Sequence, residues 1–185
     1  VNTAPVAVDD IVRLPTGVSE ILVNEFTVNA GYTSVVAALA DGGFVVTWDT
    51  HDRQFDDVSD SAINAHIFDQ NGTEVVSEFL VNTFTNDNQS VPDVTALSNG
   101  GFVITWFSYD PQQGDDNGTG IKARIFNADG TEAVSEFLVN ELTSDSQSYS
   151  SVVELADGSL VFIWTSYDPQ QGDDSGTGIK ARIFN

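Results

Sequence analysis

The chain has 185 residues, of which 41% are hydrophobic, and its 28 acidic and 6 basic residues give a formal net charge of −22. This apolar content is enough for a sizeable core, so an intrinsically disordered chain is not expected. The charge makes nucleic acid a poor partner, because phosphate binding needs Lys and Arg, and the absence of cysteine excludes disulfides and thiolate chemistry.

The N-terminal stretch Val1–Gly17 is predicted to be a linker or an edge strand. Pro5 and Pro15 keep it out of the centre of a sheet, because proline cannot donate to the hydrogen-bond ladder. No apolar run is long enough for a membrane span and no signal-peptide pattern is found, so membrane insertion is not expected. The absence of methionine indicates a processed product or a piece of a longer chain.

Residues 18–185 consist of three tandem repeats that form one domain or part of a larger propeller. The repeats are 19–76, 77–134 and 135–185. Each begins with Ser-Glu-Ile-Leu-Val-Asn or Ser-Glu-Phe-Leu-Val-Asn, and each contains one tryptophan, Trp48, Trp106 or Trp164. Self-similarity at a fixed spacing of about 58 residues is typical of repeat architectures.

Each repeat is predicted to contain four strands, which in the second repeat are Glu78–Asn82, Asp93–Leu97, Phe102–Ser108 and Gly120–Asn127. An Asn-Gly or Asp-Gly pair between the second and third strands predicts a tight hairpin, because both residue types tolerate positive φ. The third strand is apolar on both faces, which is typical of a strand inside a stack of sheets. A second turn, Asn71-Gly72 or Asp129-Gly130, leads to the next repeat.

The fourth strand carries Lys122 and Arg124 in one copy and Lys180 and Arg182 in the next. On an outermost strand, such cations discourage edge-to-edge pairing with other molecules. The alternative is a cation pair that binds an acidic ligand or a neighbouring aspartate. His66 occupies the corresponding position in the first repeat and is expected to point outward.

The fold class predicted from this pattern is all-β, with tandem four-stranded antiparallel sheets that resemble the blades of a β-propeller. Three blades are fewer than the about four to eight that usually close a ring. Further blades or association of chains would complete a closed ring, whereas an open row of sheets would not need one. A stacked β-sandwich array is the alternative fold.

The acidic loops after the third strand are the candidate metal sites, because calcium prefers carboxylate and carbonyl oxygens. The expected ligands are Asp110, Asp115, Asp116 and Asn117 in the second repeat, Asp168, Asp173 and Asp174 in the third, and Asp52, Asp56 and Asp57 in the first. Glycines in the later loops allow backbone carbonyls to approach the same ion. The alternative is a solvated, Asp- and Gly-rich turn whose charge serves solubility.

Tyr109 and Tyr167 begin these loops and are the candidate residues for stacking on a sugar ring, whereas the tryptophans are expected to pack in the core. No nucleophile motif accompanies His51 or His66, and paired carboxylates carry little information in so acidic a chain. The sequence therefore predicts a protein that is not an enzyme.

The motifs Ser-Glu-Phe-Leu-Val-Asn, Asp-Gly-Gly-Phe-Val-Val-Thr-Trp and Gly-Ile-Lys-Ala-Arg-Ile-Phe-Asn-Ala-Asp-Gly resemble repeats of very large secreted bacterial proteins of the RTX and adhesin type. The opening Asn-Thr-Ala-Pro-Val-Ala-Val-Asp-Asp is similar to linkers of cadherin-like domains in those proteins. The resemblance implies secretion or cell-surface placement, calcium-rich surroundings and an adhesive or structural role. The glycine-rich calcium nonapeptides of that family are missing here.

The leading functional hypothesis is thus a non-enzymatic extracellular repeat module for adhesion or surface structure, stabilised by calcium. Two alternatives remain. One is a lectin-like propeller that binds a surface glycan through Tyr109 and Tyr167. The other is a self-assembling subunit whose partners are copies of itself or further repeats, with Val1–Gly17 as a donated strand.

Overall fold

A computed structural model describes residues 20–25, 33–51, 61–85, 87–109, 118–143, 145–167 and 176–185. These residues form eleven strands and no helix, which confirms the predicted all-β class. None of them accordingly belongs to a helix that is long and apolar enough to cross a bilayer.

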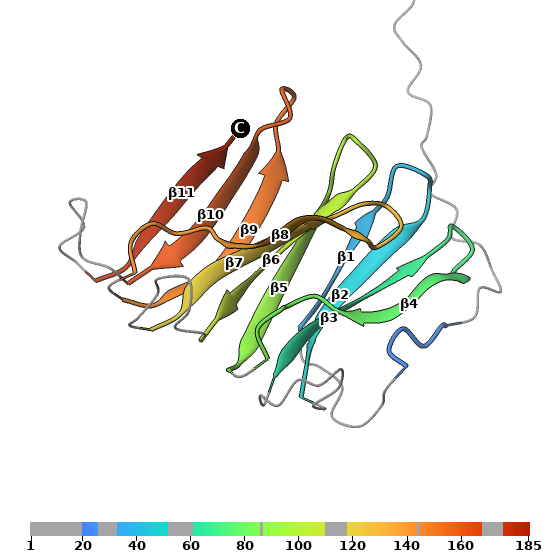
Figure 1. Ribbon diagram of the computed structural model, residues 1–185, viewed down its shortest axis with the longest axis horizontal. Coiled ribbons are helices and arrows are strands. Elements are labelled where there is room, and N and C mark those ends of the chain that lie inside the picture. The colour runs from blue at the N-terminus through green and yellow to red at the C-terminus, as the bar shows by residue number, and fades with distance from the viewer. Residues whose placement is uncertain are drawn as a thin grey trace, which may run out of the picture.

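The strands make three antiparallel sheets that stand side by side in an open row (Figure 1). The first sheet has the order β1 (Ser34–Ala38), β2 (Phe44–Thr50), β3 (Ala62–Phe68), β4 (Glu74–Leu80). The second has the order β5 (Gln89–Ala96), β6 (Phe102–Ser108), β7 (Gly120–Phe126), β8 (Glu132–Leu138). The third consists of β9 (Gln147–Glu154), β10 (Leu160–Ser166) and β11 (Gly178–Phe184). The described sheets do not close into a ring.

The sheets are offset by one strand from the sequence repeats. The motif Ser-Glu-Phe-Leu-Val-Asn was expected to open the second repeat's own sheet, but its residues from Ser77 to Leu80 lie in β4, the last strand of the first sheet. The reason is that the short Asn71-Gly72 and Asp129-Gly130 turns join paired neighbours, β3 to β4 and β7 to β8. The longer connection between β4 and β5 leads to the next sheet instead.

This offset changes the role of the basic strand. The strand β7 is paired on both edges, with β6 and with β8, so it is not an outermost strand. Lys122 on β7 is completely buried. The prediction that these cations protect a free edge is therefore wrong for the second sheet.

The predicted hairpins between the second and third strands of the repeat form β1–β2, β5–β6 and β9–β10. In the middle one, the Gly100 amide donates to the Leu97 carbonyl at 2.9 Å and the Leu97 amide donates to Gly101 at 2.8 Å. Gly100 has φ +93°, whereas Asn99 does not take positive φ. The turn thus needs the left-handed conformation only at glycine, as in hairpin loops of three residues.

Two apolar clusters hold the row together. The first lies between the first and second sheets and includes Ile63, Phe102 and Trp106. The second lies between the second and third sheets and includes Ile121 and Phe162. Residues of β6 enter both clusters, because alternate side chains point to opposite faces of the sheet. The prediction of a tryptophan-bearing strand buried on both faces is confirmed for β6.

Polar contacts fix the position of the second sheet relative to the third. The Thr95 hydroxyl donates to the Val152 carbonyl at 2.7 Å, and the Ser151 hydroxyl donates to an Asp93 carboxylate oxygen at 2.7 Å. A β-bulge in β5 precedes Asp93, where Val91 has φ 52°. The extra residue of a bulge re-aims the following side chains, and here it directs the Asp93 carboxylate to the next sheet.

Candidate functional site

The predicted calcium ligands all lie outside the described residues, so their arrangement stays a prediction. These residues are Asp52, Asp56, Asp57, Asp110, Asp115, Asp116, Asn117, Asp168, Asp173 and Asp174. The strands that lead into the three loops end at equivalent places in successive sheets. The loops therefore start from the same rim of the row.

The two tyrosines proposed for sugar stacking are described, and they lie at this rim. Tyr109 follows β6 and Tyr167 follows β10; their side chains are 53% and 44% exposed. Each backbone amide is anchored, since Tyr109 donates to Asn88 and Tyr167 donates to Ser146, both at 3.0 Å. The Tyr109 ring also packs edge-on against Phe107, with ring centroids 5.9 Å apart. Exposed aromatic rings are thus presented at matching positions of two neighbouring sheets.

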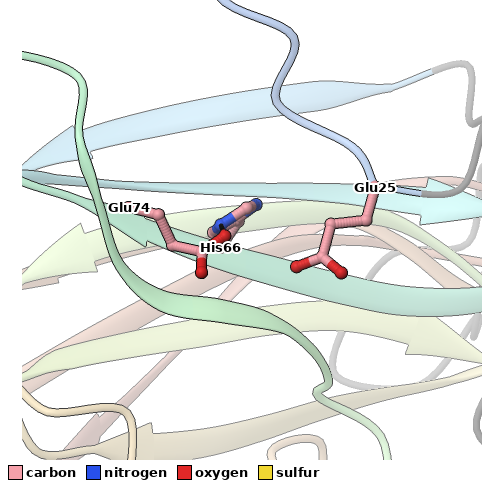
Figure 2. Close-up of side chains that lie close together, drawn as sticks. All are labelled: Glu25, His66 and Glu74. Carbon is pink, nitrogen blue, oxygen red and sulfur yellow. Dashed lines mark hydrogen bonds and ion pairs between the residues drawn. The ribbon is translucent and has the colours of Figure 1, made fainter.

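A second constellation, which the sequence analysis did not identify, lies on the first sheet. Glu25, His66 and Glu74 bring one ligand atom each within 4.8 Å of one another. Figure 2 shows that the three side chains come from different parts of the chain: the N-terminal segment 20–25, β3 and the start of β4. His66 is buried, whereas both glutamates are exposed. The expectation that His66 points outward is therefore wrong.

The His66 ring lies between two oxygen atoms. Nδ1 lies 2.6 Å from the Val23 carbonyl oxygen, and Nε2 lies 3.0 Å from Oε2 of Glu74. Both partners are acceptors, whereas a neutral imidazole carries only one N–H. The observed geometry is satisfied by the imidazolium form, which donates from both nitrogens. It would also be satisfied by a cation held between Nε2 and the carboxylates, with Nδ1–H oriented by the carbonyl.

The other repeats show which side chain occupies the same position. Arg124 occupies the position of His66 in the second sheet, and its guanidinium donates to the Val81 carbonyl at 2.8 Å and to Glu132 at 2.9 Å. Arg182 in the third sheet donates to the Val139 carbonyl at 2.9 Å. The carbonyl and the carboxylate of the first sheet therefore recur at the same spacing around an arginine. This recurrence shows that the same carbonyl and carboxylate positions can be held by a side chain of the third strand of a sheet.

This junction has a clear structural effect. In each case a side chain on the third strand of a sheet contacts a carbonyl from the segment that precedes that sheet: Val23, Val81 or Val139. In the second sheet the Ser135 hydroxyl and the Arg124 guanidinium lower the pKa of Glu132, because both stabilise its ionised form. In the second and third sheets the junction therefore attaches one sheet to the segment that leaves the preceding sheet, through charge-assisted hydrogen bonds.

Comparisons with known proteins identify a fold relative. The sequence matches no protein-family model and no curated protein. The structure is similar to that of an endo-arabinase from Bacteroides thetaiotaomicron VPI-5482, with a TM-score of 0.50 and 13% sequence identity. The similarity covers 82% of this chain and 55% of the endo-arabinase. The chain thus spans about half the length of that enzyme.

This similarity corrects one expectation. The sequence predicted a protein that is not an enzyme, but the arrangement of its sheets is one that occurs in an enzyme. Since sequence identity is low, what the two proteins share is the fold. The absence of a recognisable nucleophile motif was therefore too weak a ground for excluding catalysis.

Proposed function

We propose that this chain is a repeat-built β-sheet module that binds carbohydrate through the rim carrying Tyr109 and Tyr167. The observation that carries the proposal is the pair of anchored, half-exposed aromatic rings at equivalent positions of the second and third sheets. Aromatic rings pair an apolar face with a polar hydroxyl, which suits the mixed surface of a sugar. The fold relative, an endo-arabinase, makes arabinan the first polymer to test.

The proposed setting is extracellular or at a cell surface, where binding to a glycan would serve adhesion or surface structure. The resemblance of the repeats to those of RTX and adhesin-type proteins supports this setting. Calcium in the acidic loops is part of the same proposal. It would rigidify the loops that begin at the two tyrosines and would offset their dense negative charge.

The test is a titration of the protein with arabinan and with a panel of other polysaccharides, followed by calorimetry. We expect the Tyr109→Ala, Tyr167→Ala double variant to bind its best ligand at least about tenfold more weakly, which corresponds to about 1.4 kcal/mol. The matched control is the double substitution to phenylalanine, which keeps the rings and should retain most of the affinity.

Two results would contradict the proposal. One is the absence of binding to any polymer of the panel at millimolar sugar concentration. The other is equal affinity of the wild-type protein and the double alanine variant. Reducing ends are measured in the same samples, because their release would extend the function from binding to glycoside hydrolysis.

A further inference from the structure

The third sheet has a free edge in the described residues. Strands β3 and β7 are paired on both sides, but their counterpart β11 is paired with β10 alone. Nζ of Lys180 on β11 is shielded from solvent and has no hydrogen-bond partner among the described residues. A buried ammonium without a partner is costly, so this edge is incomplete as it stands.

The outward face of the third sheet is also uncovered. Ile63 and Ile121 occupy the same position of β3 and β7, and both are completely buried between sheets. Their counterpart Ile179 is 75% exposed, and Ile163 and Ile183 on the same sheet are exposed as well. The surface that packs against a following sheet twice in this structure thus faces solvent the third time. Exposed apolar surface of this kind marks an interaction site.

The chain carries a segment that matches this edge. Residues Ser19–Asn24 read Ser-Glu-Ile-Leu-Val-Asn, which differs at one position from the motif Ser-Glu-Phe-Leu-Val-Asn at the end of β4 and of β8. Residues 20–24 belong to no strand in the part of the chain that the structure describes, and Leu22 among them is 71% exposed. This segment nevertheless contacts the first sheet in the same way as the segment after β4 contacts the second sheet. The Val23 carbonyl lies beside His66, and the Val81 carbonyl lies beside Arg124.

The first two sheets show how such a segment binds to its neighbour. The Val81 amide donates to the Ile63 carbonyl at 2.8 Å, and the Asn82 side chain accepts from the Ile63 amide at 2.8 Å. The same clamp recurs at Ile121, which donates to the Asn140 side chain at 2.7 Å. Ile179 is the corresponding residue of β11. A segment ending in Val-Asn would thus close on its backbone in the same way.

The charges match as well. In the first sheet, Glu78 of the motif accepts from Asn64 at 2.6 Å, and Asn64 occupies the position that Lys180 has in β11. The corresponding residue of the N-terminal motif is Glu20. A strand contributed by this motif would therefore bring a carboxylate to the one described lysine ammonium that is buried without a partner.

We propose that the segment Glu20–Asn24 of a second copy of this chain adds as a fourth strand to β11. The donor segment and the acceptor edge lie at opposite ends of the row of sheets (Figure 1), so the partner is another molecule. The contact is head-to-tail, and such contacts form rings when the rotation closes. Two copies supply six sheets, within the range of about four to eight that closed propellers use. The sequence-based donor, Val1–Gly17, lies outside the described residues.

Engineered cysteines test the predicted register, because the chain has no cysteine of its own. Ala65 pairs with Phe79 and Ala123 with Phe137, so Ala181 should pair with Ile21 of the partner. Paired antiparallel residues have Cα atoms about 4.5 to 5.5 Å apart, which a disulfide can span. We expect an Ile21→Cys protein mixed with an Ala181→Cys protein to give a crosslinked heterodimer under mild oxidation. In the control, a Val75→Cys protein is used in place of the Ile21→Cys protein.

Mass measurement by sedimentation gives an independent readout. We expect twice the single-chain mass of 19.9 kDa for the wild-type protein and a single-chain mass for Leu22→Lys, which places a second positive charge opposite Lys180. The matched control is Val75→Lys, which places the same charge at a site 58% exposed on β4, away from the proposed contact. The proposal would be overturned by a single-chain mass at all protein concentrations. It would also be overturned by a yield of crosslinked dimer no higher than that of the Val75→Cys control. Exchange of Glu20 and Lys180 within one chain should restore the dimer that Glu20→Lys alone weakens.

Discussion

Replacement of one repeated isoleucine at two positions measures how much stability the packing between sheets provides. Ile121 on β7 is completely buried between the second and third sheets, whereas Ile179 on β11 is largely exposed. Truncation of a buried isoleucine to alanine costs about 2 to 5 kcal/mol, through lost transfer free energy and the cavity that remains. For a chain of this size, each kcal/mol lowers Tm by about 2 to 4 °C. Ile121→Ala should therefore lower Tm by at least about 4 °C.

The assay is urea unfolding followed by tryptophan fluorescence, with Ile179→Ala as the matched control. Both substitutions are made on the Leu22→Lys background, so that association does not cover the third sheet. There Ile179→Ala should change the free energy of unfolding by less than about 0.5 kcal/mol, as is usual for surface sites. Similar losses from the two variants would refute the argument, because they would mean that the two isoleucines are equally buried.

Three further predictions concern the charged groups. His66→Arg should raise the free energy of unfolding by about 1 kcal/mol, because the guanidinium at this position donates to both the carbonyl and the carboxylate in the second sheet. An unchanged urea midpoint would count against this. Amide hydrogen bonds, first from Thr73, lower the pKa of Asp69 in the folded state, so its contribution is present above the unfolded pKa and lost as pH falls through the folded pKa; Asp69→Asn should flatten the acid limb of a stability–pH curve. Millimolar calcium, but not magnesium, should raise Tm, and a double Asp110→Asn, Asp168→Asn variant should lose that shift. A Tm that does not change with calcium would contradict calcium binding in these loops.

Much of the fold could be predicted from local patterns. The two-faced apolar strand Phe102–Ser108 has the predicted bounds in β6, because alternation of side chains fixes which residues share a face. The turn at Asn99-Gly100 was predicted because both residue types tolerate a positive φ, although only Gly100 adopts it. The grouping of strands into sheets was not predictable in the same way. A periodic sequence specifies the length of its repeat but not where one sheet ends, and the offset by one strand placed Lys122 inside the protein.

The candidate sites also differ in how far the sequence could predict them. Tyr109 and Tyr167 could be identified from their place between an apolar strand and a polar loop, and the structure describes them as exposed. The group of Glu25, His66 and Glu74 could not, because its members are brought together from three segments by strand pairing and the entry of the N-terminal segment. In the sequence, the sign of this group was that His66 aligns with Arg124 and Arg182. This alignment was interpreted as an outward-facing position.

By itself, the sequence determined the repeat, the strands and the extreme acidity of this protein, since these depend on residue type and on spacing between near neighbours. Only the tertiary structure decided which strand closes each sheet, which cations are buried and which repeated surfaces stay open. These depend on contacts between segments far apart in the chain, such as Val23 with His66, where the free energy of burial rather than local propensity selects the arrangement.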